Sequence, residues 1–356
     1  MNNKKIVFTI PAIAGGGMGR AVLNFAEPLS KMGYNVTIFL LASKKIEKYT
    51  TPKNITVETG VKGKYSKFKF SFSLIRLRNY CKTNRIDYVF SFSGQHSCYV
   101  IISLIATSTK VYAFHRANPY LKYGFINDIL NRLFFPLSSG LVVQTKLAKK
   151  IFKEKYKHKN IIVVPNPVMD IETSLSLKRK NIIITVSRLI KSKGVDKLIS
   201  IFDKVANDVN DWELWIIGDG PEKGNIENMI NMCLHKNRIK LLGFRTDIDE
   251  LLSQASIFAF TSQSEGYPNA LLEAMCSSLA CISYDCVAGP SDIIKNGENG
   301  FLVENNNELL YVSKLLELMK DENLRLKFSQ EAIKLNVENN SLKIVSEFIE
   351  KINNIE

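Results

Sequence analysis

The sequence predicts an α/β chain of two domains, each built on its own parallel sheet. Three observations support this fold class. The chain has 356 residues, of which 46% are hydrophobic, so it can bury two separate cores. Apolar, β-branched runs alternate with amphipathic segments in both halves. The opening of the chain reads strand, glycine loop, helix, strand, which is the pattern of a βαβ unit.

The first half is expected to open with a strand over residues 4–11, a flexible glycine loop over 15–19, a helix over 20–32 and a strand over 35–41. The glycines are spaced G-x-G-x-G, and no acidic residue ends the second strand, so we do not expect a dinucleotide site. His115 follows a later strand. At that edge of a sheet it either faces a ligand cleft or is a structural histidine.

The N-terminus can also be interpreted as a signal peptide, because Lys4-Lys5, an apolar run and Ala12-Ile13-Ala14 imitate its three regions. Cleavage there would delete the first strand of the βαβ unit, which argues against it. No apolar run is long enough to span a membrane. The six cysteines show neither C-x-x-C pairs nor histidines at metal spacing, so we expect reduced thiols in a cytosolic protein.

The segment 264–274 places two carboxylates, Glu265 and Glu273, on a loop that turns into a helix. Gly266 permits close approach of a ligand to the backbone, and Glu273 can accept hydrogen bonds from a ribose diol. The free amides of a helix start bind phosphate. The amides in question belong to Asn269, Ala270 and Leu271. A capped helix with a surface glutamate at each end is the alternative.

Two cations follow the expected buried strand 182–187. Arg188 and Lys193 would lie at its carboxyl end, where open α/β sheets bind their ligands, and can neutralise a leaving diphosphate. A solvated basic loop is the alternative. Three further segments, each a short apolar strand followed by a turn, lie at 215–221, 239–244 and 257–262. In the first of them, Gly218 and Gly220 allow a nucleotide to lie close to the backbone.

These motifs, in this order, resemble those of retaining glycosyltransferases of family 4, which have the GT-B fold. Glu265 and Glu273 match the E-x7-E signature, and Arg188, Lys193 and Gly194 match R-x4-K-G. The resemblance implies two Rossmann-like domains that face a central cleft. The segment 165–168, with two prolines, is the expected hinge and gives domains at residues 1–167 and 168–340. The resemblance adds a helix at 341–356 that crosses back to the first domain.

The resemblance also assigns further residues to the site. In this family the glycine loop, here with Gly16 and Gly17, lies against the diphosphate and sugar of the donor. A histidine at the place of His115 contacts the donor sugar, and Phe244-Arg245 lies where relatives place the base. The chain departs from the family at two points. Gly19-Arg20 replaces a small residue and glutamate, and Asp292 replaces the glutamate of many members.

The positive charge is confined to the first half. Residues 1–170 contain 27 Lys and Arg against 7 Asp and Glu, whereas residues 171–356 contain 21 against 27. Two basic segments with interleaved aromatic residues, 62–85 and 146–159, suit an anionic membrane surface or nucleic acid. A solvated face is the alternative. We expect membrane contact at the inner face of the cytoplasmic membrane, and no nucleic acid partner.

The resemblance implies an enzyme that moves a hexose or N-acetylhexosamine from a nucleotide diphosphate sugar, expected to be UDP-linked, to a lipid-linked oligosaccharide. The product would be a bacterial surface glycan such as O-antigen or capsule. The acceptor hydroxyl would attack from the side on which the diphosphate leaves, while Glu265 holds the sugar and Arg188 with Lys193 stabilises the leaving charge.

No cofactor or metal is expected. Asp247 and Asp249 have the D-x-D spacing of metal-dependent glycosyltransferases, but they stand where a helix is expected to begin. Two other function classes stay open. A sugar-nucleotide epimerase or hydrolase of the same fold would keep the cleft, and a basic nucleic-acid-binding protein would explain only the charge of the first half.

Overall fold

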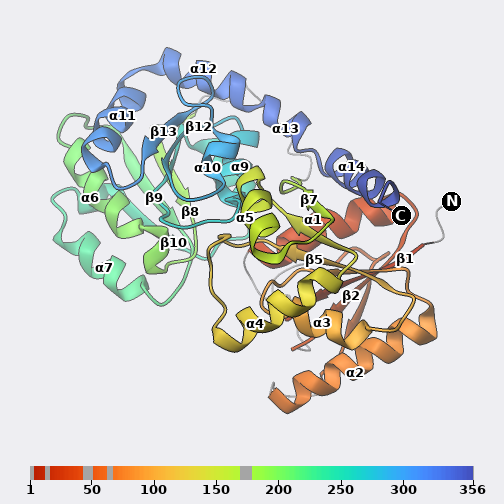
Figure 1. Ribbon diagram of the computed structural model, residues 1–356. Coiled ribbons are helices and arrows are strands. Elements are labelled where there is room, and N and C mark those ends of the chain that lie inside the picture. The colour runs from red at the N-terminus through yellow and green to blue at the C-terminus, as the bar shows by residue number, and fades with distance from the viewer. Residues whose placement is uncertain (1–3, 13–16, 43–50, 62–66, 169–178, 356) are drawn as a thin grey trace. The chain divides into compact units, whose positions relative to one another are not determined.

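The computed structural model describes residues 4–12, 17–42, 51–61, 67–168 and 179–355. The chain divides into two compact units (Figure 1). Unit 1 comprises Met1–Met169 and Ser341–Glu356, and unit 2 comprises Asp170–Asn340. Each unit is a parallel sheet covered by helices, so the predicted fold class is confirmed.

Unit 1 contains a seven-stranded sheet in the order β3-β2-β1-β4-β5-β6-β7, with every neighbouring pair parallel. The chain runs outward from β1 to β3 and then returns to place β4 on the other side of β1. The switch point of this sheet therefore lies between β1 and β4. The strands are β1 (Lys5–Ile10), β2 (Asn35–Leu40), β3 (Thr56–Thr59), β4 (Tyr88–Ser91), β5 (Lys110–His115), β6 (Gly140–Val143) and β7 (Ile161–Val163).

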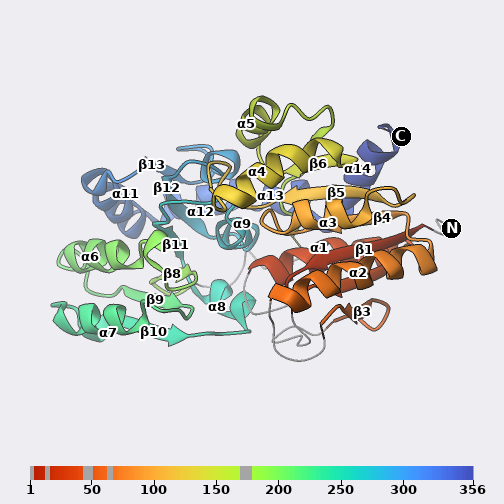
Figure 2. The ribbon, with the colours of Figure 1, turned by 60° about the horizontal axis from the view of Figure 1, so that its bottom comes forward.

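Helices cover both faces of this sheet (Figure 2). Because side chains alternate along a strand, Ile6 and Phe8 join a core with α1 and α14, whereas Val7 joins a core with α2, α3 and α5. In the first core, Phe348 of α14 packs against Phe25 and Phe114. The helices are α1 (Gly17–Lys31), α2 (Lys67–Asn84), α3 (Ser97–Leu104), α4 (Phe125–Phe134), η1 (Phe135–Leu137), α5 (Lys146–Tyr156) and α14 (Ser341–Asn353).

Unit 2 contains a six-stranded parallel sheet in the order β10-β9-β8-β11-β12-β13. Its switch point lies between β8 and β11, because the chain leaves β8 in one direction and returns on its other side. The strands are β8 (Ile182–Val186), β9 (Glu213–Ile217), β10 (Ile239–Gly243), β11 (Ile257–Phe260), β12 (Ala280–Asp285) and β13 (Phe301–Glu304).

The helices of unit 2 pack around this sheet. Side chains of α6, α7, α11 and α12 share one core with β8, β9, β11 and β12, and α9 contacts β11 and β12. The helices are η2 (Lys191–Lys193), α6 (Val195–Val205), α7 (Lys223–Met232), η3 (Lys236–Arg238), α8 (Ile248–Gln254), α9 (Asn269–Cys276), α10 (Pro290–Ile293), α11 (Glu308–Lys320), α12 (Glu322–Ala332) and α13 (Lys334–Glu338).

The start of α1 differs from the sequence prediction. Gly17 and Gly19, which we expected in a flexible loop, lie in the first turn of the helix. Residues 15 and 16 of that loop lie outside the described ranges, and the second of them is the predicted site residue Gly16. Glycine is poorly suited to a helix interior, so the pattern does not reveal that the helix begins this early.

The structure also shows the state of the cysteines and the character of the helices. All six cysteines are free. Burial raises the pKa of Cys81 and Cys276 to about 12, so these thiols stay protonated and act as small apolar groups. Within the described ranges, no helix has both the length and the apolar character needed to cross a membrane.

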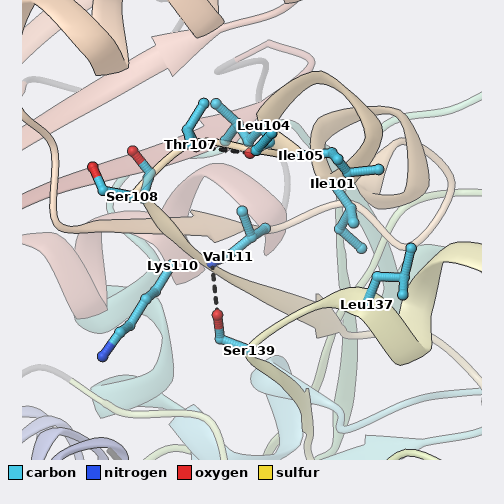
Figure 3. A pocket seen from close by; sticks show the side chains of 11 residues that line it. Ile101, Leu104, Ile105, Thr107, Ser108, Lys110, Val111, Leu137 and Ser139 are labelled. Carbon is cyan, nitrogen blue, oxygen red and sulfur yellow. Dashed lines mark hydrogen bonds between the residues drawn. The ribbon is translucent and has the colours of Figure 1, made fainter.

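A pocket of about 360 Å³ lies in unit 1 where β5 begins (Figure 3). The end of α3, the start of β5 and Leu137 of η1 line it. In its wall the amide of Val111 donates to Ser139 Oγ at 3.2 Å. The pocket contains none of the predicted site residues, because His115 stands at the opposite, carboxyl end of β5.

Candidate functional site

The loops after β8 and β11 are joined at the switch point of unit 2. The amide of Gln263 donates to the carbonyl of Ser192 at 2.8 Å, and Thr261 Oγ1 donates to the carbonyl of Gly194 at 2.8 Å. These bonds bring the side chains of both loops to the carboxyl edge of the sheet, where α/β folds bind ligands.

Gly194 makes this junction possible. Its φ of 63° lies in the left-handed region, and a Cβ there would stand 2.4 Å from the carbonyl oxygen of Thr261. A side chain at this position would therefore meet both backbone strain and a collision. The glycine of the R-x4-K-G motif thus serves to end η2 and to let α6 start against the neighbouring loop.

Lys193 and Glu265, which the sequence predicts for the site, form an ion pair. Nζ of Lys193 lies 2.5 Å from Oε1 of Glu265, and the side chains are only 22% and 11% exposed. A charge-assisted bond that is largely shielded from water is stronger than a surface pair. The two motifs therefore meet in one place, as the predicted site requires.

Gly218 and Gly220 have a structural role that differs from the one we predicted. A Cβ at Gly218 would lie 1.8 Å from the carbonyl oxygen of Ser187, and one at Gly220 would lie 2.3 Å from that of Leu189. The close approach is made by the chain's own backbone, since the loop after β9 packs on the loop after β8. Their contact with a nucleotide stays a prediction.

The second glutamate lies in α9, the helix that follows the loop of Glu265. Glu273 is 7% exposed, one turn into the helix. Pro268 precedes the helix and offers no side-chain cap. The amides of Asn269, Ala270 and Leu271 lie in the first turn, where the helix supplies no carbonyl, so they are the groups that a phosphate would contact.

The loop before α9 is supported by the loop after β12. A Cβ at Gly289, where φ is 99°, would lie 2.4 Å from Cδ of Pro268 and 3.4 Å from the carbonyl oxygen of Gly266. This packing supports the backbone around Gly266, and the approach of a ligand there stays a prediction. Asp292, one of the two departures from the family pattern, follows in α10 and helps to raise the pKa of Tyr267, mainly an effect of burial.

The remaining predicted residues of unit 2 are more exposed. Arg188 is exposed, and its guanidinium makes no hydrogen bond or ion pair with another described residue. Phe244 is partly exposed. Nε of Arg245 donates to Oδ1 of Asp247 at 2.8 Å, so this arginine already has a carboxylate partner.

The D-x-D segment lies at a helix start. Asp247 is the residue before α8, and Asp249 lies in the first turn of that helix. In the part of the chain that the structure describes, no three His, Cys, Asp or Glu side chains are placed to hold a metal ion together.

In unit 1, His115 is buried at the end of β5. It is 5% exposed, and its Nε2 lies 3.2 Å from Oη of Tyr123. Gly94 leaves room for this pair, since a Cβ there would stand 2.5 Å from that hydroxyl. Burial, and to a lesser extent the charge of Lys155, lowers the pKa of His115 to about 3. The neutral ring suits an orienting group and not an acid or base.

This depressed pKa predicts acid sensitivity. An unfolded histidine titrates near 6.5, so between pH 6.5 and 3 the unfolded chain binds the extra proton and stability falls with falling pH. At pH 5 this difference in proton binding at His115 lowers the free energy of unfolding by about 2 kcal/mol. Urea unfolding followed by circular dichroism should show that His115→Gln loses about 2 kcal/mol less than the natural chain between pH 7 and 5. His235→Gln in unit 2 is the control, and equal losses in all three proteins would contradict the account.

Sequence reasoning missed two sets of residues. Arg116 Nη2 donates to Asn166 Oδ1 at 2.5 Å, which Gln144 also contacts, and Asn24 Nδ2 donates to the carbonyl of Pro167 at 2.7 Å. This network ties the segment after β7 to unit 1. Ser187 Oγ, beside Arg188, is buried without a hydrogen-bond partner among the described residues. A serine after a strand carries no signal of this kind in sequence.

Both halves of the chain match known glycosyltransferase families. The family described as "Glycosyltransferase Family 4" matches residues 15–170, and "Glycosyl transferases group 1" matches residues 170–335. An uncharacterized glycosyltransferase of Haemophilus influenzae is 28% identical over 353 residues, which cover 97% of this chain and 99% of the relative.

A second relative has a named activity. It is the GalNAc-alpha-(1->4)-GalNAc-alpha-(1->3)-diNAcBac-PP-undecaprenol alpha-1,4-N-acetyl-D-galactosaminyltransferase of Campylobacter jejuni. It is 26% identical, with 90% of each chain covered. Among solved structures, a mutant of TarM from Staphylococcus aureus, crystallised with fondaparinux, alpha-GlcNAc-glycerol and UDP, matches with a TM-score of 0.84 and 15% identity. The match covers 98% of this chain and 100% of TarM, which shows a common fold.

Proposed function

The chain belongs to glycosyltransferase family 4 and has the GT-B fold, and on this premise we propose that it is a retaining enzyme using a UDP-linked sugar. The transferred group is a hexose or N-acetylhexosamine. The UDP in the TarM complex supports the choice of nucleotide. The observation that carries the proposal is the Lys193–Glu265 pair at the switch point of unit 2, one loop away from Glu273.

The pair gives the donor two partners at once. A diphosphate that enters this edge competes with Glu265 for the ammonium of Lys193. When Lys193 turns to the phosphate, the Glu265 carboxylate stays beside it and accepts hydrogen bonds from the sugar hydroxyls. Arg188, the amides of α9 and Lys193 then share the diphosphate charge, and the buried Glu273 accepts from the ribose diol.

Retention follows if attack and departure occur on the same face of the sugar. The acceptor hydroxyl approaches beside the leaving diphosphate and transfers its proton to a diphosphate oxygen. The C–O bond to the acceptor forms as the bond to the diphosphate breaks, so no protein base is needed. The chain contributes charge stabilisation and positioning.

The acceptor in this proposal is a lipid-linked oligosaccharide of a bacterial surface glycan. The undecaprenol-linked substrate named for the Campylobacter jejuni relative supports it. A hydrolase or epimerase of the same fold is the second candidate.

Nucleotide release separates these functions. Donors are first selected by thermal shift among nucleotide sugars, and UDP release is then measured with and without undecaprenyl diphosphate-linked N-acetylglucosamine. The proposal expects release that depends on the acceptor. Equal UDP release without acceptor favours the hydrolase. Conversion of the donor sugar to its epimer without acceptor favours the epimerase.

We predict that activity is independent of metal. Arg188, Lys193 and the start of α9 supply the positive charge that a cation would bring, and Asp247 is already paired with Arg245. Turnover in excess EDTA should therefore equal turnover with added manganese. The prediction would be overturned if activity required a divalent ion absolutely and if Asp249→Asn abolished this metal-dependent activity.

A further inference from the structure

Helix α4 of unit 1 is apolar on two sides. Its inner side packs Leu130 and Phe134 against the core of α2, α3 and α5. On its outer side Phe125 is 83% exposed, Ile126 is 70% exposed and Leu133 is 60% exposed. A surface helix normally turns its polar face outward, and a helix that is apolar all round is normally buried.

The outer residues form one stripe. Phe125, Ile129, Leu133 and Leu137 follow each other at intervals of four along α4 and η1, and Ile126 lies beside them. We call these five residues the α4 stripe. Leu137 also lines the pocket of Figure 3 together with the exposed Ile105, which directly follows α3, so the apolar surface continues to the end of that helix. A contiguous apolar patch of this kind marks a binding surface.

Exposed cations lie close to this patch in the sequence. Lys122 and Arg132 are exposed on either side of Phe125 in the sequence, and every lysine of α5 is exposed. Asp128 is the acidic residue within α4. The segment 62–85, which we predicted to contact lipid, contributes a second apolar row, because Phe68, Phe72 and Ile75 of α2 are also exposed.

The same segment is less available as a source of charge than its composition suggests. Arg76 donates to the carbonyl of Gly60, and Arg78 donates to those of Ser103 and Ile105. Residues 62–66, with Lys62 and Lys64, lie outside the described ranges. Among the described residues of unit 1, α4 and η1 also carry more exposed apolar side chains than the basic segment that the sequence singled out.

We propose that the α4 stripe inserts into the interface of a bilayer that contains anionic lipid. The positive charge of unit 1 selects this occupant over a second copy of the chain, because pairing two such surfaces would bring like charges together. Apolar side chains partition among the headgroups while the neighbouring lysines and arginines meet lipid phosphates. The inference deepens the proposed function, since it brings the enzyme to a lipid-linked acceptor.

Vesicle sedimentation of the full chain tests this inference. Vesicles of phosphatidylcholine with phosphatidylglycerol should sediment the natural chain, and the triple variant Phe125→Ser, Ile126→Ser, Leu133→Ser should bind at least about tenfold more weakly. The control is Met232→Ser with Leu234→Ser, which removes two equally exposed apolar side chains from unit 2 and should bind like the natural chain.

Phe125→Trp provides a direct readout. Trp212 is buried and Trp215 is half-buried in unit 2, so a blue shift and gain of fluorescence on adding vesicles would report insertion at position 125. Leu234→Trp should show no such change. UDP release to a water-soluble acceptor should be the same in the triple variant and the natural chain, which separates failure of docking from failure of the proposed function.

Two results would overturn the inference. Unchanged vesicle binding of the triple variant would show that the α4 stripe does not contact lipid. Light scattering without vesicles gives the second result. If the natural chain forms a concentration-dependent dimer and the triple variant stays monomeric, the α4 stripe joins two copies of the chain.

Discussion

Lys193→Met and Glu265→Gln should each lower the turnover number by about 10² to 10³, which is the usual effect of removing a group that stabilises transition-state charge. Lys193 loses its contact with the leaving diphosphate, and Glu265 loses the charge that holds both Lys193 and the donor sugar. UDP release in the presence of acceptor measures both effects. Lys191→Met, which removes an exposed charge two residues away, should remain close to the natural chain.

The double variant makes this prediction sharper. Because the two side chains act on one another, removing both should cost less than the product of the two single effects. Strictly multiplicative losses would mean that the two groups act independently, and full activity of either single variant would show that the pair lies outside the reacting site.

Gly218→Ala should destabilise unit 2 by about 2 to 5 kcal/mol, because backbone strain and overpacking act together. The residue has a φ of 142°, and the added Cβ would lie 1.8 Å from the carbonyl oxygen of Ser187. Trp212 and Trp215 both lie in unit 2, so the midpoint of urea unfolding followed by tryptophan fluorescence reports the change.

Gly224→Ala is the matched control. Apart from its chain neighbours and the backbone of its own helix α7, no described atom lies within 4 Å of a Cβ at Gly224, so this change should stabilise the unit by about 0.5 to 1 kcal/mol. Equal unfolding midpoints for the two variants would show that the contact between the loops after β8 and β9 does not hold this edge together.

The sequence predicts much of unit 2 because its strands are recognisable from short stretches of neighbouring residues. Strands β8 and β11 end within two residues of the expected positions, since a buried parallel strand is a continuous apolar run. The proximity of Lys193 and Glu265 can also be predicted from the sequence, because both residues follow strands that meet at a switch point.

Other features depend on contacts between distant segments. The occupants of the space beside Gly218 and Gly220 are carbonyls of another loop, which no local pattern reveals. The neutrality of His115 depends on its burial by surrounding side chains. Periodicity likewise shows that α4 is apolar, but it does not show which of its sides faces the core.

The central claim is that the switch point of unit 2 holds a uridine diphosphate sugar, and titration calorimetry with UDP in EDTA tests it most directly. The account predicts that UDP binds the natural chain and Glu317→Ala equally, because Glu317 is exposed on α11, outside the motifs. Glu273→Ala should bind at least about tenfold more weakly, since it removes a charge-assisted contact to the ribose. Unchanged affinity in Glu273→Ala, or no binding of UDP to the natural chain, would contradict the assignment of this site.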